Sequence, residues 1–85
     1  MIFEFTFIIV NNPDTVSVTF SKKDVPEGMH DLVCDVAHTV GHTINMRFPD
    51  GLSSDMLMCG TIDSKTKRFS ETSFERMPSK DTPIH

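Results

Sequence analysis

Three of the four histidines and one of the two cysteines of this chain recur at every fourth residue, as His30, Cys34, His38 and His42. On an α-helix, residues four apart lie one above the other, with Cβ atoms about 6 Å apart. Imidazole and thiolate groups bind zinc, and a thiol beside an imidazole is the arrangement of a cysteine nucleophile. The spacing therefore defines a His/Cys stripe along one edge of a helix.

The His/Cys stripe lacks part of what either chemistry requires. Four residues spread over three helical turns lie too far apart to bind one ion, and no closely spaced pair of cysteines adds ligands. A cysteine nucleophile also needs donors for the developing oxyanion, and no motif of the sequence supplies them. We predict no metal, no cofactor and no catalytic residue, with the stripe at the polar border of a helix. A metal-stabilised domain or a Cys34-dependent enzyme is the most distant alternative.

The helix that positions the His/Cys stripe is predicted over residues 25–40. Asp24 and Glu27 have the spacing of a capping box at its start. Apolar residues then recur at intervals of three and four, which is typical of a helix with one buried face. They are Met29, Leu32, Val33, Val36, Ala37 and Val40. Gly41 is a typical helix end, because glycine adopts the left-handed conformation without strain, so His42 is expected just beyond the last turn.

Five further segments alternate apolar and polar residues, which is the period of a β-strand. Clusters of Asn, Pro, Asp, Gly and Ser separate most of them, as turns require. The predicted strands cover residues 2–10, 16–20, 44–48, 56–62 and 68–77. Gly60 marks a predicted bulge in the fourth strand. The last strand has few apolar positions, which is typical of the edge of a sheet.

These segments predict an α+β fold in a single domain, residues 1–77, followed by a flexible tail at residues 78–85. The predicted order is β-β-α-β-β-β. Short turns favour an antiparallel sheet of four to five strands with one helix packed on one face. A domain of this size buries only about 60–65% of its unfolded surface, which leaves little room for an enclosed substrate pocket. The sequence therefore predicts a protein that is not an enzyme.

Charge and cysteine content restrict the location and the partners of the chain. The net charge is −4, and residues 1–42 carry two basic against six acidic side chains, which argues against a general nucleic-acid coat. The apolar N-terminus contains Glu4 and no basic residue, so it predicts a strand and neither a signal peptide nor a membrane span. Two cysteines in such a chain indicate a reducing compartment, so a cytoplasmic location is expected.

The main functional hypothesis is a small non-enzymatic interaction protein that binds a larger protein as an inhibitor or adaptor. A compact, acidic α+β chain is typical of phage and plasmid accessory proteins, which act on a host protein. The predicted partner surface is the acidic helix edge, formed by Glu27, Asp31, Asp35 and His38. Addition of a partner's strand to the final edge strand is a second mode of docking. The same exposed edge makes a homodimer an alternative assembly.

The alternative hypothesis is an RNA-binding or RNA-dependent regulator. Basic side chains in the second half of the chain have the chemistry to follow a phosphate backbone, and Phe69 or Phe74 to stack on a base. The basic residues are Arg47, Lys65, Lys67, Arg68 and Arg76. The competing interpretation is a solvated hairpin tip whose charges prevent edge-to-edge aggregation.

Overall fold

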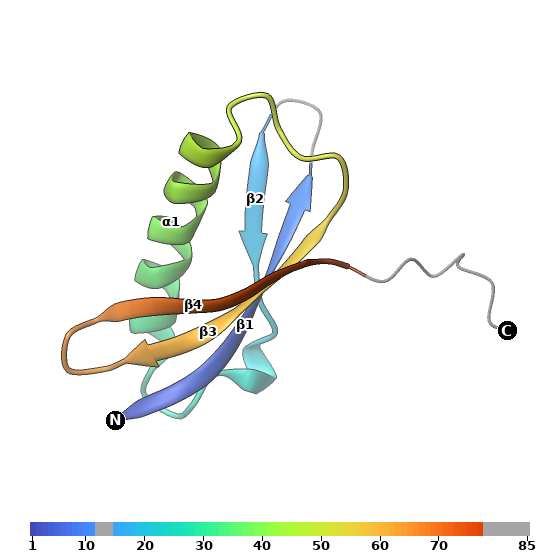
Figure 1. Ribbon diagram of the computed structural model, residues 1–85. Helices are drawn as coiled ribbons and strands as arrows, with labels where there is room; N and C mark the ends of the chain where they lie inside the picture. The colour runs from blue at the N-terminus through green and yellow to red at the C-terminus, as the bar shows by residue number, and fades with distance from the viewer. Residues whose placement is uncertain (12–14, 78–85) are drawn as a thin grey trace, which may run out of the picture.

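Figure 1 shows the computed structural model, which describes residues 1–11 and 15–77. The elements follow in the order β1 (Ile2–Asn11), β2 (Val16–Thr19), the 3₁₀ helix η1 (Lys22–Asp24), α1 (His30–Arg47), β3 (Met56–Asp63) and β4 (Arg68–Arg76). The turn predicted at residues 12–14 and the tail predicted at 78–85 lie outside the described residues. In the part of the chain that is described, no helix is both long enough and apolar enough to cross a membrane.

The four strands form one antiparallel sheet in the order β2-β1-β3-β4. β1 pairs with β3 from Ile2 opposite Asp63 to Ile9 opposite Met56, whereas only its last four residues pair with β2. β2 and β4 therefore form the edges of the sheet. The predicted α+β class, the antiparallel sheet and the edge position of the last strand are confirmed.

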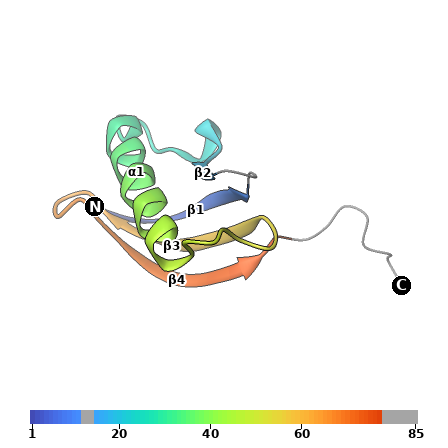
Figure 2. The same ribbon diagram turned by 90° about the horizontal axis from the view of Figure 1, so that it is seen from above.

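α1 lies across one face of the sheet, and the opposite face carries no second layer of described residues (Figure 2). Alternate residues of β1 point toward α1, so Phe5, Phe7 and Ile9 are buried. The apolar stripe of the helix meets them, and Phe7 also contacts Phe69 of β4 with ring centroids 5.3 Å apart. The core residues are Phe5, Phe7, Ile9, Val16, Val33, Val36, Ala37, Val40, Ile44, Met58 and Ile62.

The strand predicted at residues 44–48 is wrong, and so is the helix end predicted at Gly41. α1 continues to Arg47, so the sheet has four strands and the order is β-β-α-β-β. Gly41 keeps the helical backbone, and a Cβ on it would lie 3.4 Å from Cγ2 of Val18 in β2. Ile44 continues the apolar stripe by one further turn and is fully buried. The buried stripe therefore extends the helix past the glycine.

The helix also begins five residues later than predicted. Gly28 has a φ of +79°, a left-handed conformation that no residue inside a right-handed helix adopts. Asp24 belongs to η1 instead, and Met29 takes the N-cap position of α1 without a side-chain cap. The predicted capping box is therefore not formed.

A bulge interrupts the pairing of β3 with β4. Cys59 lies opposite Ser73 and Gly60 lies opposite Glu71, so Thr72 is the extra residue of β4. Phe69 covers Gly60 so closely that a Cβ there would lie 2.6 Å from the ring. The register shift lies beside Gly60, as predicted, but the extra residue belongs to β4 and not to the strand that contains the glycine. The bulge changes which residues of β4 face α1.

Candidate binding groove

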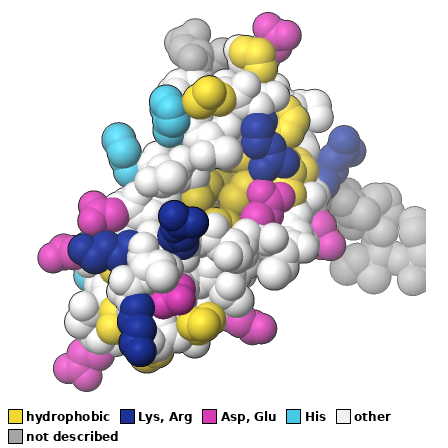
Figure 3. Space-filling model, turned by 60° about the vertical axis from the view of Figure 1, so that its left-hand side comes forward, with side chains coloured by type: hydrophobic (Ala, Val, Ile, Leu, Met, Phe, Trp, Pro, Cys, Tyr) yellow, Lys and Arg dark blue, Asp and Glu magenta, His cyan; other side chains and the backbone are white. Residues whose placement is uncertain are grey.

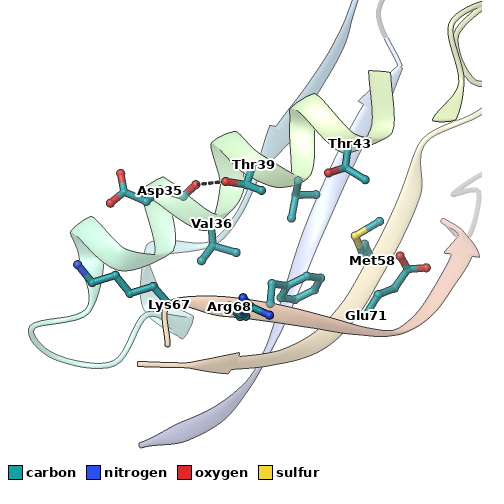
Figure 4. A pocket seen from close by; sticks show the side chains of 10 residues that line it. Asp35, Val36, Thr39, Thr43, Met58, Lys67, Arg68 and Glu71 are labelled. Carbon is teal, nitrogen blue, oxygen red and sulfur yellow. Dashed lines mark hydrogen bonds between the residues drawn. The ribbon is translucent and has the colours of Figure 1, made fainter. Parts of the chain in front are cut away.

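A groove of about 340 Å³ runs between α1 and β4 (Figure 4). Apolar side chains from both layers form its floor: Val36, Val40, Met58 and Phe69. Polar side chains form its rim: Asp35, Thr39 and Thr43 from α1, and Lys67, Arg68 and Glu71 beside or within β4. A groove with an apolar floor and a polar rim is the usual composition of a binding site.

The groove results from the unequal approach of α1 to the two edges of the sheet. On one side, Gly41 lets the helix pack closely against Val18 of β2. On the other side, Val36 and Val40 face the groove instead of a tightly packed partner from β4. The helix therefore lies closer to β2 than to β4, and the groove occupies the space on the β4 side.

A cluster of charged and aromatic side chains ties the C-terminal end of α1 to β4. The guanidinium of Arg47 forms an ion pair with the Glu71 carboxylate at 2.8 Å. It also lies 5.4 Å from the ring centroid of Phe74, which stacks on Phe48 at 5.7 Å. Figure 4 shows Glu71 at one end of the groove and Lys67 at the other. We call the cluster of Arg47, Glu71, Phe48 and Phe74 the Arg47 clasp. It fixes the position of the C-terminal end of α1 over the sheet.

The free edge of β4 borders the groove. The Met77 N–H donates to the Asp55 carbonyl at 2.9 Å, which fixes the alternation of hydrogen bonds between β3 and β4. Because this alternation assigns every second residue of an edge strand to solvent, four residues present backbone N–H and C=O groups outward. With the shift at the bulge, they are Phe69, Glu71, Phe74 and Arg76.

The structure places three residues of the predicted acidic partner surface on α1 and the fourth before it. Asp35 lines the groove on the β4 side of the helix, whereas His38 lies on the other side, beside β2. Asp31 is exposed in the first turn of α1, and Glu27 precedes the helix in a turn. Asp31, Asp35 and His38 therefore share the exposed ridge of α1 between the two grooves, because positions i, i+4 and i+7 lie on one helical face, whereas Glu27 lies outside the helix.

The predicted RNA-binding residues are also spread out. Lys65, Lys67 and Arg68 gather at the turn between β3 and β4, but Arg47 is engaged in the clasp. At about 3.3 Å per residue, the length of β4 separates Arg68 from Arg76 by roughly 26 Å. Figure 3 shows acidic side chains interspersed with basic ones on this side of the molecule. The basic residues therefore form one local cluster and no continuous basic stripe.

The His/Cys stripe lies wholly on α1, because the helix extends to Arg47. His30 Nε2 and Cys34 Sγ approach to 3.5 Å, and His38 and His42 border a second groove between α1 and β2. No group of three or more potential metal ligands is found within residues 1–11 and 15–77.

The groove and the Arg47 clasp are the features that the sequence analysis missed. The Arg47 clasp depends on the last turn of α1, which was expected to form a strand, whereas the groove depends on which strand lies beside residues 35–43 of the helix. The available signal was the spacing from Val40 to Ile44, which continues the helical stripe across Gly41. Comparison with protein-family models, curated proteins and solved structures finds no match to this chain. The groove itself must therefore support any functional proposal.

Proposed function

We propose that this protein is a small non-enzymatic interaction module that binds an extended segment of a larger protein in the groove between α1 and β4. The observation that carries the proposal is the position of the groove beside the free backbone edge of β4. Strand addition needs both features, because backbone hydrogen bonds supply affinity and pockets for alternate side chains supply specificity.

The chemistry of the groove defines the segment that fits it. A strand paired with β4 places every second side chain over the floor, where Val40 and Phe69 favour an apolar anchor. Lys67 and Arg68 at the β3–β4 turn favour an acidic residue at one end of the segment. A site with one or two anchors supports affinities on the order of micromolar, because ordering an extended segment opposes binding.

An inhibitor or adaptor fits this mode of binding, since occupying an exposed segment of a host protein requires no catalytic group. The small size and acidic balance of the chain support an accessory role of the phage or plasmid type. Cys34 and Cys59 are both free thiols, which supports a reducing, cytoplasmic location.

The proposal is tested by selecting displayed random peptides of about eight residues, a length that matches one strand, on the immobilised protein. Thr43→Trp fills the groove from its exposed rim, and His42→Trp is the matched control because it fills the groove on the β2 side. We expect Thr43→Trp to weaken the selected peptides at least about tenfold and His42→Trp to change binding less than about twofold. Amide NMR shifts should concentrate at Phe69, Glu71, Phe74 and Arg76.

Two results would reject the proposal. One is the absence of any enriched peptide, and the other is equal binding by the Thr43→Trp variant and the native protein. Tight binding of a single-stranded RNA probe, lost in a Lys65→Glu, Lys67→Glu variant and steeply reduced by salt, would favour the RNA-binding alternative instead. Thermal unfolding of each variant checks that the substitution leaves the fold intact.

A further inference from the structure

The edge strand β4 is complementary to itself. We propose that two copies of the chain pair antiparallel through β4, with Arg68 of one copy opposite Glu75 of the other and Phe69 opposite Phe74. This inference does not rest on the proposed function, because it concerns the free protein and is measured without a partner segment.

The faces of β4 restrict how two copies can pair. Phe69 lies opposite the buried Ile62 and Phe74 opposite the buried Met58, so both point to the side of the sheet that α1 covers. Glu71 shares this side through its bond to Arg47. The neighbours of these residues point to the uncovered side: Arg68, Ser70, Ser73 and Glu75. The bulge at Thr72 is what reverses the alternation between the two halves of the strand.

Two conditions restrict the pairing of one β4 with another. Residues directly opposite each other must have their side chains on the same face of the sheet. The residues that bond across the two strands must also be ones whose backbone groups point away from β3. Two registers that keep most of β4 paired meet both conditions away from the bulge. One places Phe69 opposite Phe74 of the second copy, and the other places Phe69 opposite Arg76. Registers shifted from these by one residue place a core-facing side chain opposite one on the uncovered face.

Side-chain chemistry selects the first register. It places Arg68 opposite Glu75, Phe69 opposite Phe74 and Ser70 opposite Ser73, and the twofold axis repeats each pair. Opposite charges and paired aromatic rings are the favourable cross-strand combinations. The second register leaves Glu75 opposite a serine and Arg76 opposite an aromatic ring.

The charges used by the first register are available in the free chain. Among residues 1–11 and 15–77 the ion pair that forms joins Arg47 to Glu71, so Arg68 and Glu75 have no ionic partner there. Pairing the two edges would join the sheets into eight continuous strands and satisfy the outward backbone groups of Phe69 and Phe74. Both helices would lie on the same face of the joined sheet. A partner segment and the second copy would then compete for the same edge.

The experiment uses sedimentation equilibrium on the full chain and on the single variants Arg68→Glu and Glu75→Arg. We expect the native protein to dimerise below about 100 μM and each variant to bind itself at least about tenfold more weakly, because like charges then face each other. An equimolar mixture of the two variants should dimerise like the native protein, since every introduced charge then faces an opposite charge. Lys65→Glu, in the turn outside β4, is the control and should leave dimerisation unchanged.

The mixture of the two variants tests whether residue 68 of one copy faces residue 75 of the other, which is the contact that defines the proposed register. A native protein that stays monomeric at several times that concentration overturns the proposal. So does a dimer that the single variants do not weaken, or a mixture of variants that stays monomeric while both are folded by circular dichroism. A monomer that still selects peptides would overturn the dimer and leave the proposed function standing.

Discussion

Replacing Gly41 with alanine is expected to stabilise this protein, although a glycine in such a position looks like the end of a helix. Gly41 lies in the interior of α1 and its φ is not positive. An alanine Cβ there would lie 3.4 Å from Cγ2 of Val18, at the short limit of ordinary van der Waals contact. The substitution therefore adds a contact between α1 and β2 without straining the backbone.

The size of the gain follows from helix propensity. Glycine in a helix interior is about 0.8–1 kcal/mol less favourable than alanine. The contact with Val18 is close enough to take back part of this, so we expect the free energy of unfolding to rise by about 0.5–1 kcal/mol. For a domain of this length, that corresponds to an increase in Tm of roughly 2–8 °C.

Gly60→Ala is the matched substitution with the opposite expected sign. Its Cβ would lie 2.3 Å from the Ser70 carbonyl oxygen and 2.6 Å from the Phe69 ring. The Ser70 oxygen belongs to the backbone and the Phe69 ring is packed against Phe7, so the backbone of β4 must move. Overpacking of this kind lowers the free energy of unfolding by about 1–3 kcal/mol. The displaced Phe69 would also disturb the floor of the groove.

Urea unfolding followed by circular dichroism measures both changes, with the m-value as a check that the unfolding transition stays comparable. The reasoning requires Gly41→Ala and Gly60→Ala to move the midpoint in opposite directions. A lower midpoint for Gly41→Ala would refute it, because the chain could then not be helical through position 41 with the described packing. A neutral Gly60→Ala would refute the close approach of β4 to β3 at the bulge.

Three further substitutions test the last turns of α1 and the Arg47 clasp. Ile44→Ala should lower the free energy of unfolding by about 2–5 kcal/mol, because the side chain is fully buried. Met46 is 70% exposed, so Met46→Ala should change the free energy of unfolding by less than about 0.5 kcal/mol. Equal effects of the two substitutions in urea unfolding would count against the helix. Arg47→Met should lower the free energy of unfolding by about 1 kcal/mol, because the ion pair with Glu71 and the contact with Phe74 are lost. The part of this loss that is due to the ion pair should decrease as salt is raised from about 0.05 to about 0.5 M in the same assay.

The four strands were predictable because each has one face buried under α1 and one face exposed. Phe5, Phe7 and Ile9 alternate with Thr6 and Ile8 along β1, and this alternation is what an antiparallel sheet with one covered face imposes. The sparse apolar positions of β4 likewise predicted its place at an edge, since an edge strand has fewer neighbours to pack against.

The bounds of the helix were not predictable by the same rule. Ile44 belongs both to a period of two with Met46 and to a period of four with Val40, so the pattern alone does not separate a strand from a helix. Packing decides between them, because Ile44 fits the core only when the chain stays helical. The start of the helix was misplaced because the left-handed backbone of Gly28 cannot be read from its spacing.

The groove requires knowledge of which strand lies beside which side of α1. Asp35 and Lys67 were assigned to two different surfaces, an acidic one and a basic one. The strand order brings them to the same groove, with opposite charges on its two walls. The position of a charge in the sequence does not predict this result. It does not show that α1, which connects β2 to β3, has β4 beside one of its sides.

The central position of β1 has a consequence for biosynthesis. Ile2 is translated before Asp63, which lies opposite it in the finished sheet. A nascent chain can form the β1–β2 hairpin first, but the edge of β1 that pairs with β3 stays exposed until β3 has been translated. The sheet is therefore completed only after β3 has been translated, and truncation before Met56 would leave the most apolar strand without the neighbour that protects it from aggregation.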